Sequence, residues 1–239
     1  MVPHEPFRQD VIEISALLDG HVRPDEPWKL TNLFVWYKHR FLPALLVHHD
    51  AEEEIMFPEV AKRVAVPPKA TADHRTLVAK MREIEAIADD YLARGGEDPT
   101  PALAAETLPK IREEWRAFRA LLLPHLEEEE FLFVGPIKDA FTKAEFDAIV
   151  QRIARSEGPA AARIVLPWIE FAMHRWAPAP VLDEFHTNVP GVLLFLSRTF
   201  WMPAFLRYHR AALDSLRAGA PKTLVNEFAG GGGARCSLM

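Results

Sequence analysis

His48-His49-Asp50-Ala51-Glu52-Glu53-Glu54-Ile55-Met56-Phe57-Pro58 is the stretch that decides the fold, and its chemistry returns later as His125-Leu126-Glu127-Glu128-Glu129-Glu130-Phe131. In each copy an imidazole stands four residues before a carboxylate, which puts both on the same face of an α-helix. Two helices that turn such faces toward each other would bring two imidazoles and two carboxylates to one interior point. The pattern therefore predicts a helical protein with an interior metal site, and iron is the expected metal.

The composition of the 239-residue chain excludes several classes of protein. With 28 basic and 34 acidic residues it offers no basic patch for nucleic acid. Its one cysteine excludes an internal disulfide and suits a reducing compartment. The N-terminus lacks the features of a signal peptide, and the most apolar segment, Val189 to Leu206, is interrupted by Arg198 and Pro203. We expect a cytoplasmic protein without a transmembrane segment.

Apolar periodicity and breaker residues predict an all-α protein whose first 140 residues contain four helices: Pro3 to Gly20, Trp28 to Arg63, Lys69 to Arg94, and Thr100 or Pro101 to Val134. Short connections between them predict an up-and-down antiparallel four-helix bundle. Pro43 and Pro124 fall inside helical patterns and predict kinks. With a rise of 1.5 Å per residue, four histidines lie about 24 to 36 Å from the turns, at the same end of the bundle: His4, His48, His74 and His125.

The candidate metal ligands are His4, His48, Glu52, His74, His125 and Glu129. Each stands where its helix otherwise carries an apolar side chain, and a buried glutamate costs several kcal/mol unless it is paired or coordinated. Nitrogen and oxygen donors without thiolates favour iron, with manganese or zinc as alternatives. His49 and Glu53 form the same pair rotated by about 100°. His49, Glu53 and Glu128 are alternative ligands, or groups that hydrogen-bond to the ligands and orient them.

The motifs in these segments, in Asp73-His74-Arg75 and in His4-Glu5-Pro6-Phe7-Arg8 resemble those of the hemerythrin-like, or HHE cation-binding, domain. The resemblance covers roughly residues 1 to 140. It implies a non-haem centre of two iron ions, oxo- or hydroxo-bridged, in which Glu52 and Glu129 are bridging carboxylates. It also implies four terminal imidazoles, which belong to His4, His48, His74 and His125.

The chain departs from the oxygen-carrying hemerythrins at one position. They have a second histidine one turn after the third-helix ligand, where this sequence has Val78. The centre is then one ligand short, which implies an open coordination position. Our first hypothesis is a protein that binds iron and binds or senses oxygen, or a related small diatomic ligand, rather than an enzyme. A di-iron oxidase or peroxidase is an alternative. A third hypothesis is a metal-stabilised interaction module tethered to a membrane by a prenyl group.

Residues 141–228 are predicted to form a helical extension packed on the bundle, beginning with a capping box at Thr142 to Glu145. Within it, Glu170 and His174 read as a surface pair, and His186 and His209 as isolated. The aromatic residues are expected to pack on the bundle, or alternatively to line a groove for a partner: Phe195, Phe200, Trp201, Phe205 and Tyr208.

Residues 229–239 are predicted to be a flexible tail that ends in Cys236-Ser237-Leu238-Met239, which fits a prenylation signal. A prenyl group on Cys236 would allow membrane contact in a eukaryotic cell.

Overall fold

The computed structural model describes residues 3–219, and every secondary-structure element within that range is a helix. The all-α class predicted from the sequence is confirmed. The predicted tail, with Cys236, lies outside the described residues. Within residues 3–219 no single helix is long and apolar enough to cross a membrane. Only α8 (Ala179–Asn188) and the helix Gly191–Arg217, bent by 112°, would pass that test as a pair.

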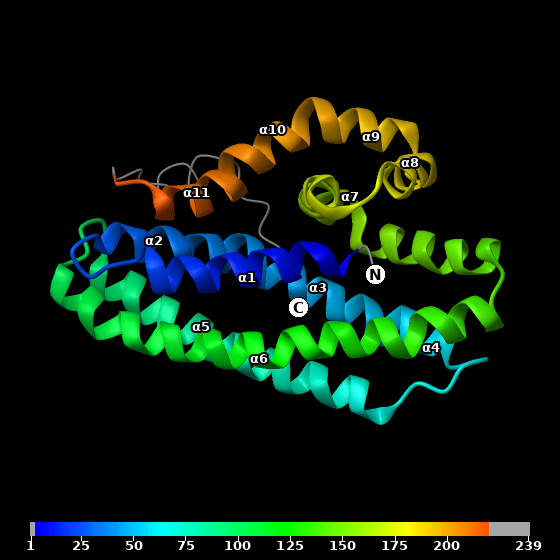
Figure 1. Ribbon diagram of the computed structural model, residues 1–239, viewed down its shortest axis with the longest axis horizontal. Helices are drawn as coiled ribbons and strands as arrows, with labels where there is room; N and C mark the ends of the chain where they lie inside the picture. Colours follow the sequence, from blue (N-terminus) through cyan, green and yellow to red (C-terminus); the bar gives the residue numbers. More distant parts are fainter. Residues whose placement is uncertain (1–2, 220–239) are drawn as a thin grey trace.

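Four helical rods of the N-terminal part lie along the long axis of the molecule (Figure 1). They are α1 (His4–Gly20); a rod of α2 (Pro27–Trp36), η1 (Tyr37–Phe41), α3 (Leu42–Ala51), η2 (Glu52–Met56) and α4 (Phe57–Val60); α5 (Pro68–Gly95); and α6 (Pro101–Ala140). Local chemistry sets their ends. The Thr100 hydroxyl accepts a hydrogen bond from the Leu103 N–H at the start of α6, and Gly96 takes a φ of 55° directly after α5.

The second rod contains two π-helical segments, η1 and η2, and each ends two residues before a proline, Pro43 or Pro58. A proline lacks the N–H donor and crowds the carbonyl four residues earlier. Widening the preceding turn by one residue relieves both problems while the rod continues. The kink predicted at Pro43 is therefore a π-helical turn, whereas Pro124 lies within α6. Segment η2 begins at Glu52, one of the predicted ligands.

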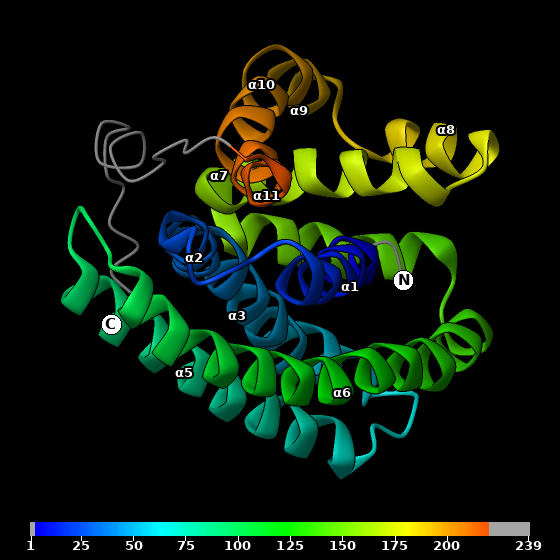
Figure 2. The same cartoon turned by 60° about the vertical axis from the view of Figure 1, so that its left-hand side comes forward.

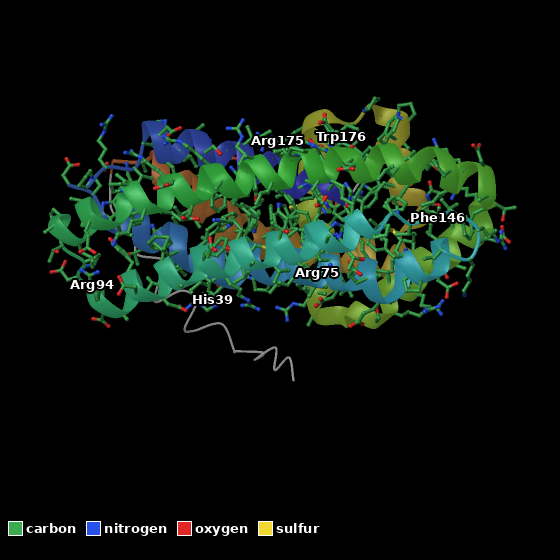
Figure 3. All side chains as sticks on the ribbon, turned by 90° about the horizontal axis from the view of Figure 1, so that it is seen from below. His39, Arg75, Arg94, Phe146, Arg175 and Trp176 are labelled. Atoms are coloured by element: carbon green, nitrogen blue, oxygen red, sulfur yellow. The ribbon has the colours of Figure 1, made fainter. Side chains whose placement is uncertain are left out.

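The helical bundle has two apolar clusters with a polar layer between them. The larger cluster includes Leu45 of α3 and Leu122 of α6. The smaller one includes Met56 and Phe133, further along the same two rods. His48 to Glu52 and His125 to Glu129 fall between these positions, so the charged residues are enclosed by apolar side chains on both sides. Figure 3 shows Arg94, beside the turn between α5 and α6, near one end of the molecule and Phe146, near the start of α7, toward the other.

A helical extension covers one side of the bundle (Figure 2). It consists of α7 (Lys143–Trp176), α8 (Ala179–Asn188), α9 (Gly191–Leu196), η3 (Ser197–Trp201), α10 (Met202–Phe205), η4 (Leu206–Arg210) and α11 (Ala211–Arg217). The predicted capping box is present at Thr142 and Glu145, and Gly158 bends α7 with a φ of 71°. The Trp168 ring of α7 packs on Phe7 of α1 at 5.0 Å and on Phe41 at 6.3 Å between centroids.

A buried hydrogen bond and a buried ion pair join the end of the extension to α1. His209 Nε2 lies 2.8 Å from Asp10 Oδ2, and both side chains are almost fully buried. The Arg210 guanidinium donates to both oxygens of the Glu13 carboxylate, at 3.0 and 2.8 Å. These contacts make the extension an integral part of the structure described here. The prediction that His186 and His209 are isolated is wrong, because His209 contacts Asp10, 199 positions away, and His186 lies 3.0 Å from Glu170. Glu170, predicted to form a surface pair with His174, is buried.

Candidate metal centre

Two buried carboxylates, Glu52 of η2 and Glu129 of α6, form the middle of the polar layer, with exposed fractions of 3% and 1%. Four imidazole Nε2 atoms, one from each rod, lie 3.3–3.6 Å from their oxygens. His4 and His74 approach both carboxylates, His48 approaches Glu52, and His125 approaches Glu129. The structure thus brings all six residues predicted as ligands together.

A fifth imidazole, that of His49, belongs to the same cluster. Its ring stacks on His74 with centroids 4.3 Å apart and meets the His125 ring edge-on at 5.7 Å. Three groups have donor atoms within 4.8 Å of one another, close enough to share a cation: His49 with His74 and His125; His4 with His48 and Glu52; and Glu52 with His74 and Glu129. The imidazoles therefore form two neighbouring donor sets, one of His49, His74 and His125 and one of His4 and His48. Glu52 lies close to both sets.

Carboxylates also lie behind three of these imidazoles. The Nδ1 atom of His4 is 3.2 Å from Glu130 Oε1, and that of His74 is 2.7 Å from Glu53 Oε1. The Nδ1 atom of His125 is 3.9 Å from Asp73 Oδ2, within ion-pair range. A carboxylate behind a ring fixes its orientation and holds the proton on Nδ1, which leaves Nε2 as an electron-pair donor toward the centre.

Many buried polar atoms of this cluster have no hydrogen-bond partner. Among the residues described, they are Nε2 of His4, His48, His74 and His125, both nitrogens of His49, Oε2 of Glu52 and both oxygens of Glu129. Each buried polar atom without a partner costs about 1–3 kcal/mol, so a native core does not gather them without compensation. Cations would satisfy these atoms except one nitrogen of His49, because only one nitrogen of a ring can face an ion in the centre. Neutral imidazoles with carboxylates are the donors that iron takes. The residues present fit a metal centre.

A comparison with protein-family models agrees with this geometry. The model of the hemerythrin HHE cation binding domain matches residues 2–137. The chain belongs to the hemerythrin HHE cation-binding family. No curated protein and no solved structure matches it. The matched region covers the four rods almost to the end of α6 and stops before α7 begins. The resemblance stated from the sequence is confirmed, and the extension lies outside the family's domain.

Within this hemerythrin domain the structure changes the expected count of imidazoles from four to five. His48 and His49 were treated as alternatives, yet both reach the cluster. His48 lies 5.2 Å from the His4 ring of α1, whereas His49 faces His74 of α5 and His125 of α6. Val78, where oxygen carriers have a histidine, is half-buried. His49 offers from α3 the imidazole that α5 lacks.

Glu53 and Glu128, predicted as alternative ligands or as groups that support the ligands, lie in different environments. Glu53 accepts a hydrogen bond from the Thr71 hydroxyl and holds His74. Glu128, expected in the same role, instead pairs with Lys69 on the surface. Glu130, which is not among the predicted residues, links His4 to Arg8. The sequence of four consecutive glutamates does not indicate which of them faces a neighbouring helix. Their orientation depends on how α1 and α6 are rotated about their axes.

Electrostatics keeps part of the cluster neutral. Burial, together with the surrounding imidazoles, holds the pKa of the His48 and His49 rings well below its usual value, so both are neutral. Burial raises the pKa of the Glu52 carboxyl to about 7, and the Glu129 carboxylate adds to that shift. For His4, burial opposes ionisation, but Glu130 and Glu52 outweigh it and raise the pKa of the ring. Protons on these groups balance charge that cations would otherwise supply.

Proposed function

We propose that this chain is a non-haem di-iron protein that binds oxygen or a related small diatomic ligand, and that it acts as a binder or sensor. The proposal includes an up-and-down antiparallel four-helix bundle over residues 1–140, supported by the order of the four rods and their short connections. One observation carries it: two donor sets with different imidazoles adjoin the same buried carboxylate, Glu52. A single ion could not use all five imidazoles and both carboxylates.

The ligand assignment follows from which donors lie together. His49, His74 and His125 would hold one ion, His4 and His48 the other, and Glu52 and Glu129 would bridge them. The second ion then has one imidazole fewer than the first. This inequality supports an open position for a small ligand on the side of His4 and His48. Iron, when bound, supplies ligand binding and one-electron redox chemistry at that position.

The protein residues around His48 would control access to the centre. The Phe7 ring lies 5.3 Å from the His48 ring, and Trp168 of the extension packs edge-on against Phe7 at 5.0 Å. These apolar rings cover part of the less coordinated side, where the His48 side chain keeps 14% of its surface exposed. His4 is fully buried and Glu129 almost so, which leaves no room for a large substrate at the carboxylates. Small ligands are therefore favoured over the substrates of an oxidase.

Anaerobic reconstitution with ferrous iron, followed by controlled exposure to oxygen, tests this function. We expect about two iron ions per chain, the number that the ligand set implies, and an optical change that is stoichiometric with oxygen and reverses when oxygen is removed. Steady consumption of peroxide or of an added reductant, lost in Glu52→Ala, would instead assign a di-iron oxidase or peroxidase. A preparation that retains less than about one iron per chain would contradict both.

A further inference from the structure

The helix Gly191–Arg217 carries an apolar stripe on the side turned away from α7. Val192, Phe195, Phe200 and Leu206 are 65%, 62%, 58% and 44% exposed, and Pro203 between them is exposed as well. The step from Phe195 to Phe200 is five residues long and crosses the π-helical segment η3. A π-helical turn accommodates the extra residue, so both rings stay on one face, with centroids 6.5 Å apart.

The opposite face of the same helix is fixed to the rest of the protein. Ser197 and Phe205 are buried there, and Phe205 packs on the Phe171 ring of α7 at 5.4 Å. His209 and Arg210 reach the carboxylates of α1. Figures 1 and 2 place α9 and α10 at the edge of the molecule opposite α5. The stripe is thus a rigidly mounted outer surface.

Charge distinguishes this surface from the rest of the chain. The chain has a net charge of −6, yet residues 185–213 contain no aspartate or glutamate and include two exposed arginines, Arg198 and Arg207. Arg198 donates to Glu170 and still exposes 53% of its side chain, and Arg207 is exposed beside Leu206. An apolar helix face bordered by arginines is the composition of a helix that lies in the interface of an anionic lipid bilayer.

We propose that the outer face of Gly191–Arg217 docks on an anionic membrane surface, with Phe195 and Phe200 inserted among the lipids and Arg207 at the headgroups. A second copy of the chain fits less well. In a two-fold pair each stripe would meet the other's arginines, and residues 185–213 provide no acidic partner to neutralise them. Docking needs no metal at the di-iron site, so its test is independent of the test of the proposed function.

Co-sedimentation with vesicles tests the proposal. The full chain, with Cys236 unmodified, is mixed with vesicles of phosphatidylcholine alone or of phosphatidylcholine containing about one-third phosphatidylserine. We expect binding to the anionic vesicles, weakened by added salt. Phe195→Ser and Phe200→Ser should each lower the affinity about tenfold, and Arg207→Gln about fivefold. The matched control is Phe131→Ser, because Phe131 of α6 is 83% exposed but lies off the stripe.

Circular dichroism and iron content, unchanged in each variant, show that the fold is intact. Equal vesicle binding by wild type and the Phe195→Ser/Phe200→Ser double variant would overturn the proposal, as would no binding to either vesicle. So would a wild-type dimer in sedimentation velocity that the double variant abolishes, since that result assigns the stripe to a second copy.

Discussion

Replacing His49 with leucine should stabilise the metal-free protein and weaken the metal-loaded one. The ring is 2% exposed, and neither nitrogen has a hydrogen-bond partner. Leucine has a similar volume and leaves no buried polar atom unsatisfied. At about 1–3 kcal/mol for each such atom, less the loss of stacking on His74, the net gain is roughly 2 kcal/mol. For a chain of this length that raises the melting temperature by about 4–8 °C.

His49→Leu should destabilise the iron-loaded protein, because His49 would be one of three imidazoles that bind one of the ions. We expect iron content to fall from about two to about one per chain, with a loss of iron affinity beyond the roughly 10- to 100-fold typical of groups behind a ligand. Differential scanning calorimetry on chelator-treated and iron-loaded samples measures both signs, and His21→Leu, at an exposed histidine, is the control. A His49→Leu variant that melts earlier without metal and keeps all its iron would refute the reasoning.

Three further predictions test the surroundings of the centre. Glu53→Gln should lower iron affinity about 10- to 100-fold in a chelator competition, because Glu53 orients His74. Unfolding of the metal-free protein should change little, because glutamine can still accept the hydrogen bond from Thr71. Although burial opposes it, Arg210 and Arg217 lower the pKa of Glu13 to about 2. The contribution of the Glu13 carboxylate to stability is therefore complete above pH about 4.5 and lost as pH falls toward 2. In urea unfolding, the free energy of unfolding of the wild type should exceed that of Glu13→Gln at pH 6, and the two values should converge by about pH 2. A difference that stays constant with pH would contradict the assignment. Trp168→Ala should cost about 3–5 kcal/mol in the same assay, because its ring joins the extension to Phe7; a loss below about 1 kcal/mol would show that the extension contributes little.

The ligand pairs could be predicted because spacing on one helix is a local property. His48 with Glu52, and His125 with Glu129, needed only the period of the α-helix and the cost of a buried carboxylate. The role of His49 could not be read in the same way. His48 and His49 point about 100° apart, and both reach the centre because α3 lies between α1 on one side and α5 with α6 on the other.

Partners distant in sequence were also beyond prediction. Glu130 meets His4 across 126 positions, and His209 meets Asp10 across 199. Such contacts depend on how two helices are rotated about their axes, which a single apolar pattern leaves undetermined by tens of degrees. Glu170 is a smaller example: the expected surface carboxylate is buried, 3.0 Å from His186 and bonded to Arg198. Tertiary packing therefore determines the contact partners of these residues, which their spacing along one helix does not predict.

Anomalous diffraction at the iron edge, from crystals of the iron-loaded protein, tests the central claim most directly. We predict two peaks roughly 3.5–4 Å apart, one beside His49, His74 and His125 and one beside His4 and His48, with Glu52 and Glu129 contacting both. A single peak, or no peak between these carboxylates, would contradict it.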